Sequence, residues 1–312
     1  MPIHPSEFGP SRILPIGTKV VLHTSGEDAA GPSGAVGVIV AAPLDATHAY
    51  RVRLVDGDEV SVTRGGFALL KEMQSAGYLA SDGCQPNVSL DRHVILRCVV
   101  GSRAYGLEHD QSDTDIRGVY LPPADARWSL FGVPEQLESD ETQECYWELQ
   151  KFLVLALKAN PNILECLHSP LVMFASELGR ELLAMRRAFV SRLIYQTYNG
   201  YVLSQFKKLE QDLRVRGELR WKHAMHLIRL LLAGVHGLQT GEIPVRVGAH
   251  RERLLDIKRG VVSWDEVNRW RIALHQEFDE AARRTELPER PDYATVDAFL
   301  IRARRWSVDH GG

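Results

Sequence analysis

The sequence predicts an α+β fold built from three successive regions of different character. Residues 13–72 contain short alternating runs broken by glycines, which are typical of a small antiparallel β-barrel. Residues 93–175 combine apolar strand-like runs with helical patterns, which favours a mixed sheet. In residues 176–312 apolar side chains recur at intervals of three and four, which predicts a helical domain. A chain of 312 residues is long enough for all three.

The N-terminal region carries one strong turn signal. Asp56-Gly57 lies between two alternating runs, as in a β-hairpin. Residues 13–72 resemble SH3-like or KOW-type modules, which bind RNA, peptides or neighbouring domains; a purely structural role is equally open. Residues 1–12 are polar and proline-rich, which predicts a loose terminus, and residues 73–92 are expected to form a linker.

The most informative stretch begins with Val94–Val100, an apolar run rich in β-branched residues that predicts a buried strand. The glycine of Gly101-Ser102 permits a sharp turn whose N–H groups can hold phosphate. The run that begins at Asp113 alternates as a strand does, so Asp113 and Asp115 are expected on one face. Paired carboxylates repel one another unless a cation binds, and oxygen ligands of this kind suit Mg²⁺.

These residues carry a family resemblance. Gly101-Ser102, followed after ten residues by Asp113-x-Asp115, resembles the signature of the DNA polymerase β-type nucleotidyltransferase superfamily. Two motifs are similar to those of one branch of this superfamily, which includes polymerase-like proteins associated with RNA ligases. These motifs are Gly-Ser-Arg-Ala-Tyr-Gly and Ser-Asp-Thr-Asp-Ile-Arg-Gly-Val. The resemblance covers residues 93–305. It implies a nucleotidyltransferase core that moves a nucleoside monophosphate from an NTP to an acceptor hydroxyl.

The resemblance also implies roles for single residues. Asp113 and Asp115 would hold two Mg²⁺ ions that activate the acceptor and neutralise the pyrophosphate leaving group. Gly101 and Ser102 would position the β- and γ-phosphates. Either Arg103 or Lys151 would add positive charge next to these phosphates.

A third carboxylate from the next strand completes the metal site in this superfamily. Glu144 is the preferred candidate because it lies in a strand-like run. Glu148 is the alternative, although it also suits the first turn of a helix. Glu141 is a less favoured candidate for the third carboxylate. An apolar residue in place of this acid would instead indicate a degenerate protein that binds nucleotide or RNA without catalysis.

The helical region contains a cationic strip. Lys222, His226 and Arg229 are spaced four and three apart, so they share one face of a helix. The strip is expected to contact the triphosphate or an RNA, unless its histidines serve only in packing. His223 and His226 are poor ligands for an oxygen-preferring ion.

Composition sets the remaining limits. The net charge of −3 gives no global attraction to nucleic acid, so any such binding must be local. No apolar run approaches membrane-spanning length, and the first residues lack the apolar core of a signal peptide. Four widely spaced cysteines fit a reducing cytoplasm. An RNA 3′ end is the favoured acceptor and a protein hydroxyl is the alternative, while the NTP used and the oligomeric state stay open.

Overall fold

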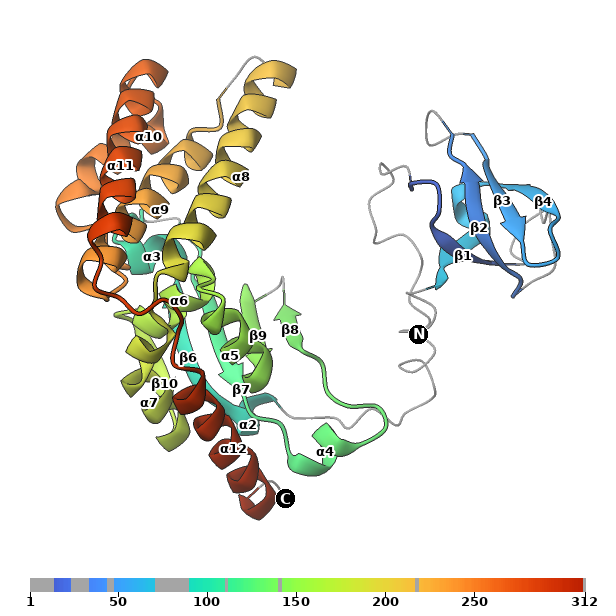
Figure 1. Cartoon of the computed structure of the whole chain (residues 1–312), viewed down its shortest axis with the longest axis horizontal. Helices are drawn as coiled ribbons and strands as arrows, with labels where there is room; N and C mark the ends of the chain where they lie inside the picture. Colours follow the sequence, from blue (N-terminus) through green and yellow to red (C-terminus); the bar gives the residue numbers. More distant parts are fainter. Residues whose placement is uncertain are drawn as a thin grey trace. The chain divides into compact units, whose positions relative to one another are not determined.

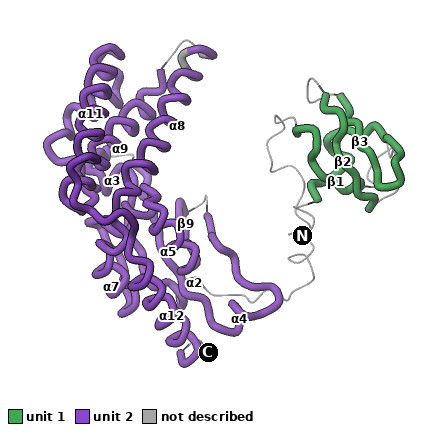
Figure 2. The backbone as a smooth tube through the Cα atoms, viewed as in Figure 1, with its two compact units in different colours: residues 1–86 green, residues 87–312 purple. Residues whose placement is uncertain are grey.

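The structure, a computed structural model shown in Figure 1, describes residues 14–23, 34–43, 48–70, 90–109, 112–139, 142–216 and 219–310. The chain forms two compact units, Met1–Pro86 and Asn87–Gly312 (Figure 2), and each is described by itself. The predicted terminus, residues 73–89 of the predicted linker, and Glu141 lie outside the described residues.

The first unit contains a five-stranded antiparallel sheet in the order β4-β3-β2-β1-β5. Its strands are β1 (Lys19–Leu22), β2 (Val36–Ala41), β3 (Tyr50–Leu54), β4 (Glu59–Val62) and β5 (Phe67–Leu69), with a 3₁₀ turn, η2 (Arg64–Gly66), before β5. The hairpin predicted at Asp56-Gly57 joins β3 to β4, and Gly57 has the positive φ of +98° that such a turn favours. The likeness to SH3 or KOW modules stays a prediction.

The second unit contains a mixed five-stranded sheet in the order β10-β6-β7-β9-β8, as the sequence predicts for this region. Strands β7 and β9 are parallel and the other pairs are antiparallel. The strands are β6 (Val94–Val100), β7 (Asp115–Tyr120), β8 (Gln136–Ser139), β9 (Glu144–Glu148) and β10 (Val172–Ala175).

The two faces of this sheet bury different sets of side chains. On one face Val119 and Trp147 join the main core, where α5 (Leu149–Leu157) and α6 (Pro161–His168) pack against the strands. On the opposite face Tyr120 and Tyr146 form a smaller cluster with Val94. Because side chains alternate along a strand, the position of a residue within its strand decides on which face of the sheet its side chain lies.

Helix α9 is the centre of the helical region and packs against α8, α10 and α11 (Figure 1). No helix among the described residues is long and apolar enough to cross a membrane. The long helices are α7 (Glu177–Ala184), α8 (Leu193–Arg216), α9 (Trp221–Thr240), α10 (Arg251–Arg259), α11 (Trp264–Arg284) and α12 (Tyr293–His310). The short ones are α2 (Leu90–His93), α3 (Gly101–Tyr105), α4 (Ala124–Trp128), η3 (Arg186–Phe189) and η4 (Gly248–His250).

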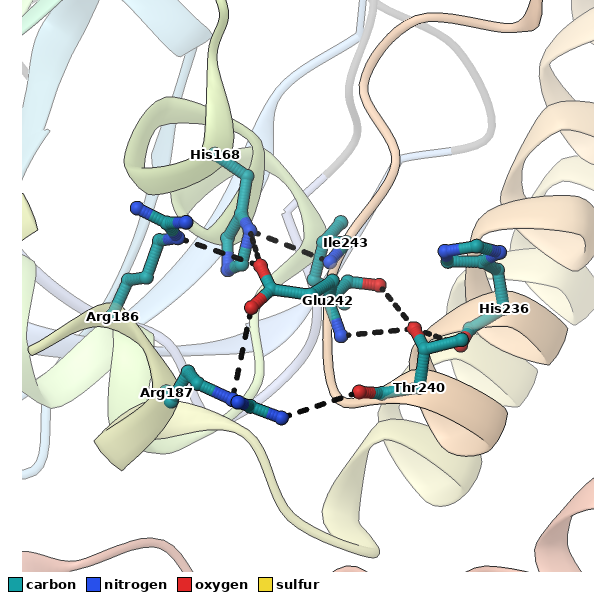
Figure 3. A network of polar contacts seen from close by, with 7 residues as sticks. All are labelled: His168, Arg186, Arg187, His236, Thr240, Glu242 and Ile243. Atoms are coloured by element: carbon teal, nitrogen blue, oxygen red, sulfur yellow. Dashed lines mark hydrogen bonds and ion pairs between the residues drawn. The ribbon is translucent and has the colours of Figure 1, made fainter.

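Glu242, just after α9, links the helical region to the end of α6 (Figure 3). Its carboxylate lies 3.4 Å from His168 Nδ1, 3.5 Å from Arg186 Nε and 3.7 Å from Arg187 Nε. The backbone N–H of Ile243 donates to the same His168 nitrogen over 3.4 Å. These polar contacts join α6 and η3 to the segment after α9, and one continuous apolar core joins the sheet to the helices.

Candidate active site

Gly101 and Asp115 lie in direct contact at the end of the β6–β7 pair. Val100 and Asp115 are register partners, so the last residue of β6 stands opposite the first of β7. Gly101 follows with φ +69° and opens α3, and a Cβ atom at this position would lie 2.3 Å from Asp115 Oδ2. Only glycine tolerates this conformation and this close approach. Strand pairing therefore brings together the two halves of the predicted motif.

A cavity of about 470 Å³ lies over this contact and is lined by both residues. The Asp115 side chain is 33% exposed, so its carboxylate is partly open to solvent. Arg117 lies beside it, with Nη2 3.9 Å from Asp115 Oδ1. The remaining polar residues of the wall come from β8 and from α6 and its N-terminus: Gln136, Glu138, Asn160, Asn162 and Glu165.

Strand register explains why Glu138 belongs to this cavity. Arg117 pairs with Cys145 across β7 and β9, and Cys145 pairs with Glu138 across β9 and β8. Directly paired residues point to the same face, so Glu138 shares the face of Asp115. The sequence analysis missed this acid because residues 124–139 carry no clear strand pattern.

The same register takes Glu144 and Glu148 to the opposite face, because they pair with Ile116 and Tyr120. Glu144 accepts a hydrogen bond from Tyr146 Oη over 3.1 Å. Glu148 is buried, caps α5 by accepting from two backbone N–H groups, and forms an ion pair with Arg304. The strand was correctly predicted, but its register places both predicted candidates for the third carboxylate on the face opposite Asp115.

Asp113, Ser102 and Arg103 are close to Asp115 or Gly101 in the chain, but none of them is among the residues that line the cavity. Asp113 is exposed and precedes β7, so the predicted alternation begins only at Asp115. Ser102 is half-buried in the first turn of α3. Arg103 Nη2 donates to the Ser112 carbonyl over 2.8 Å and so ties α3 to the loop before Asp113.

Lys151 projects from α5 to a different partner. Its Nζ lies 2.6 Å from Glu135 Oε2, in an ion pair whose two side chains are 35% and 73% exposed. Lys151 does not line the cavity of Asp115. The structure therefore does not bring this lysine to Gly101 and Asp115.

The donor chemistry of the cavity suits a hard cation. Asp115 and Glu138 offer carboxylate oxygens on one wall, with Asp113 just ahead of the strand, and oxygen ligands are those that Mg²⁺ prefers. Among the described residues, no three His, Cys, Asp or Glu side chains already converge as a metal centre. Burial raises the pKa of the Cys145 thiol to about 11, so this neighbour stays a neutral thiol at physiological pH.

A buried ionic contact closes the deep side of the cavity. Glu165 on α6 accepts from Tyr105 Oη over 2.6 Å and from Arg229 Nη1 over 2.5 Å. The Arg229 guanidinium lies over the Tyr105 ring, 3.8 Å from its centroid. Burial alone would lower the pKa of Arg229, but Glu165 and Tyr105 outweigh it and raise that pKa. Burial and Glu165 raise the pKa of Tyr105 well above its usual value.

This contact changes the interpretation of the cationic strip. The side chains of Arg229 and Glu165 are only 7% and 3% exposed, so Arg229 is not part of an exposed surface. An arginine in an apolar helical run was the available signal, because such a residue needs a buried acid as partner. Glu165 and Tyr105 carried no such signal in the sequence.

The Ala-Asn-Pro-Asn run, residues 159–162, supplies another wall. Ala159 takes a left-handed φ of +53° between α5 and α6. Asn160 Oδ1 then caps α6 by accepting from the Asn162 N–H over 3.0 Å, and its Nδ2 donates to Tyr201 Oη over 2.9 Å. Both asparagines consequently line the cavity. The sequence analysis did not assign a role to either.

Lys222 and His226 line a separate cavity of about 650 Å³ on the helical region. Burial and the surrounding cations lower the pKa of His226 to about 3, so its ring is neutral at physiological pH. This ring meets the Tyr105 ring edge to face, with centroids 6.4 Å apart. Since Tyr105 lines the cavity of Asp115, the two cavities are neighbours across this ring pair.

Comparisons with known proteins cover most of the chain. The model of the RNA repair pathway DNA polymerase beta family, RlaP, matches residues 83–302. An uncharacterized protein of Bacillus subtilis, YcgL, is 28% identical over 147 residues, which are 46% of this chain and only 56% of that protein. The crystal structure of a nucleotidyltransferase-like protein from Exiguobacterium sibiricum is 14% identical and covers 76% of this chain and 79% of that one. Its TM-score of 0.26 is too low to establish a common fold.

Proposed function

Because the chain belongs to the RNA repair pathway DNA polymerase beta family, we propose that it transfers a nucleoside monophosphate from an NTP to the 3′-hydroxyl of an RNA. The membership confirms the resemblance carried by residues 101–118. The observation that best supports the reaction is the contact between Gly101 and Asp115 at the mouth of a polar cavity. A phosphate-binding turn and a metal-binding carboxylate must meet in this way for one nucleotide to engage both.

Different residues of the chain would bind and orient different parts of the nucleotide. The Gly101-Ser102 turn would hold the β- and γ-phosphates through N–H and hydroxyl donors, and Arg117 would add charge next to Asp115. Asn160 and Asn162 offer amide groups on the facing wall for the base or ribose. Transfer of this type depends mainly on positioning and electrostatics, so no covalent intermediate with the protein is needed.

Asp115 is the carboxylate that would hold Mg²⁺ here, and Asp113 and Glu138 would have to move towards it, because no three acids converge among the described residues. When bound, the metal would supply positive charge at the reacting phosphate and at the leaving pyrophosphate. Glu138 takes the place that the sequence analysis gave to Glu144, because it shares the face of Asp115. Arg117 offsets part of the carboxylate repulsion before metal and nucleotide arrive.

A nucleotide- or RNA-binding protein without transfer activity is the second candidate. It is favoured by the two acids of β9, Glu144 and Glu148, both of which face away from Asp115. A metal site that uses Glu138 instead would take its third carboxylate from β8, which does not pair directly with β7. Catalysis and binding therefore have to be measured separately.

The decisive experiment incubates the full chain with each NTP, labelled at its α-phosphate, together with Mg²⁺ and an oligoribonucleotide that ends in a 3′-hydroxyl. We expect label on the RNA, and none when the 3′ end carries a phosphate or when Asp113→Asn and Asp115→Asn are combined. Asp297→Asn, an exposed change on α12, is the matched control and should retain transfer. Label on a protein added from cell extract, with none on RNA, would overturn the RNA acceptor. NTP binding without any transfer would establish the second candidate.

A further inference from the structure

We infer that the cavity at the start of α9 is the site that grips the phosphate backbone of a single-stranded RNA acceptor. This cavity, called the basic pocket below, is lined by Gln205, Lys208, Arg220, Trp221, Lys222, His223, His226 and Lys258. The inference rests on the proposed function for its choice of acceptor, but the binding itself is measured independently of transfer.

The charge of the basic pocket is unlike that of the whole chain. Four of its eight lining residues carry a permanent positive charge, and none is an acid. The chain as a whole has a net charge of −3, so this concentration of cations is local. Asp212 lies behind the wall, 3.7 Å from Arg220 Nε and 3.4 Å from His223 Nδ1, and offsets part of the charge. The charges of the three lysines in the lining stay available to attract an anion.

The basic pocket is assembled from three helices. Lys208 comes from α8, Lys222 from the first turn of α9 and Lys258 from the last turn of α10. Trp221 fits against the end of α10 because Gly260 has no Cβ: a Cβ there would lie 2.6 Å from the indole nitrogen. This close packing fixes an aromatic ring among the lysines.

The basic pocket also has a defined relation to the active site. His226 lines it, and the His226 ring touches Tyr105, which lines the cavity of Asp115. One turn further along α9, Arg229 is locked to Glu165 in a buried ion pair. The helix that carries the basic pocket is thus held rigidly beside the reaction cavity. An RNA strand bound in the pocket can therefore place its 3′ end near Asp115.

The chemistry favours RNA over a protein acceptor. Several cations around a wide pocket of about 650 Å³ suit a chain of phosphates, and an aromatic ring among them suits a stacked base. A neutral His226, with its pKa lowered to about 3, can donate one hydrogen bond and accept another without repelling neighbouring lysines. A protein hydroxyl would need no such set of cations.

The test compares two double variants of the full chain. Lys208→Ala with Lys258→Ala removes two cations of the basic pocket. Lys207→Ala with Arg259→Ala removes two exposed cations at adjacent positions of the same helices, outside the pocket. Fluorescence anisotropy would follow a labelled single-stranded oligoribonucleotide of about 20 nucleotides from low to moderate salt, and calorimetry would follow NTP binding.

We expect the pocket variant to bind the oligoribonucleotide about tenfold more weakly at low salt. The slope of log affinity against log salt should fall by about 1.4, roughly 0.7 for each lost phosphate contact. NTP affinity should be unchanged, and the control variant should match the wild type. Equal RNA affinity in both variants would overturn the inference, and so would a loss of NTP affinity in the pocket variant. RNA binding that depends on the pocket, without any transfer, would support the inference while refuting the proposed function.

Discussion

The two faces of the core sheet use the same residue type for different purposes. On the cavity face Asp115 is partly exposed beside Gly101 and Arg117, and Glu138 is exposed and accepts hydrogen bonds from Gln136 and Cys145. On the opposite face Glu144 bonds to a tyrosine, and Glu148 caps a helix and pairs with Arg304. The acids of the cavity face keep exposed carboxylate surface, whereas Glu148 on the other face is buried in contacts that stabilise the fold.

Two ion pairs tie distant helices to the region around the sheet: one joins α6 to α9, and the other joins the end of β9 to α12. Glu165 with Arg229 lies on the cavity side, and Glu148 with Arg304 lies on the other. The first pair is almost fully buried, while Arg304 is 22% exposed. The comparison teaches that position relative to the sheet, and not charge alone, separates a chemical role from a structural one. The predictions below test that separation.

Removal of the cavity-face carboxylate should have the largest effect. Asp115→Asn is expected to lower nucleotidyl transfer about a thousandfold or more, because metal charge contributes several kcal/mol to such a step. Unfolding in urea should change little, since asparagine preserves the shape. Full activity in this variant would show that Asp115 is not the metal-binding acid.

Breaking the buried ion pair should mainly affect folding. Arg229→Met leaves Glu165 unpaired and should lower the free energy of unfolding by about 3–5 kcal/mol, whereas Glu165→Gln with Arg229→Met should recover much of it. Arg304→Met should cost less, because Arg304 is partly in water. All six tryptophans lie in residues 87–312, so their fluorescence follows this unit alone. Equal losses for Arg229→Met and Arg304→Met would contradict the comparison.

Gly101→Ala should separate a steric effect from a conformational one. The added Cβ would press on Asp115, and a displacement of about 1 Å at a reacting group can reduce transfer about a hundredfold. Gly132→Ala is the matched control, since Gly132 has a similar φ of +62° but no atom within 4 Å of the added Cβ. The control should lose about 1 kcal/mol of stability and no activity. Similar activity in both variants would indicate that Asp115 can move aside.

The α6 helix on the cavity face should make the fold sensitive to acid. Burial is the main reason that the pKa of His168 falls to about 4, whereas the unfolded chain has a value near 6.5. Below pH 6.5 the unfolded state binds the extra proton, so stability decreases as the pH falls from 6.5 towards 4. At pH 5 this amounts to about 2 kcal/mol relative to pH 8.

His168→Asn removes the titrating group and keeps an acceptor for the Ile243 N–H. The difference in urea unfolding between pH 8 and pH 5 should therefore shrink by about 2 kcal/mol in this variant. An unchanged difference would mean that other groups dominate the acid sensitivity.

The smallest expected effect comes from Glu138 and Glu144, the acids of the two faces that are at least partly exposed. Glu138→Gln should reduce transfer about tenfold, as expected for a peripheral metal contact, and should raise the Mg²⁺ concentration needed for half-maximal activity. Glu144→Gln should retain activity, because Glu144 faces away from Asp115. The reverse result would restore Glu144 as the third carboxylate and refute the assignment made from strand register.

The sequence predicted the elements better than their registers. The β6 strand, the Gly101 turn, the acidic strand and the mixed sheet could all be derived from local patterns. Glu138 could not, because it reaches Asp115 only through two successive strand pairings. Nor could the partner of Arg229, which is 64 residues away in the chain. The alternation of side chains along one strand can be seen in a short stretch of sequence. Which residues of two strands share a face depends on how those strands pair in the fold.

The Tyr105–Glu165–Arg229 contact has a consequence for how such a protein can be divided or recombined. The sequence suggests a boundary near residue 175, yet a chain cut there would leave Glu165 as a buried charge without its arginine. The same cut would also expose the apolar core that runs from the sheet into the helices, so a neutral residue at position 165 would not by itself rescue the shorter chain. The catalytic core and its helices are therefore expected to pass together through duplication, fusion and exchange between genes, as a single heritable unit.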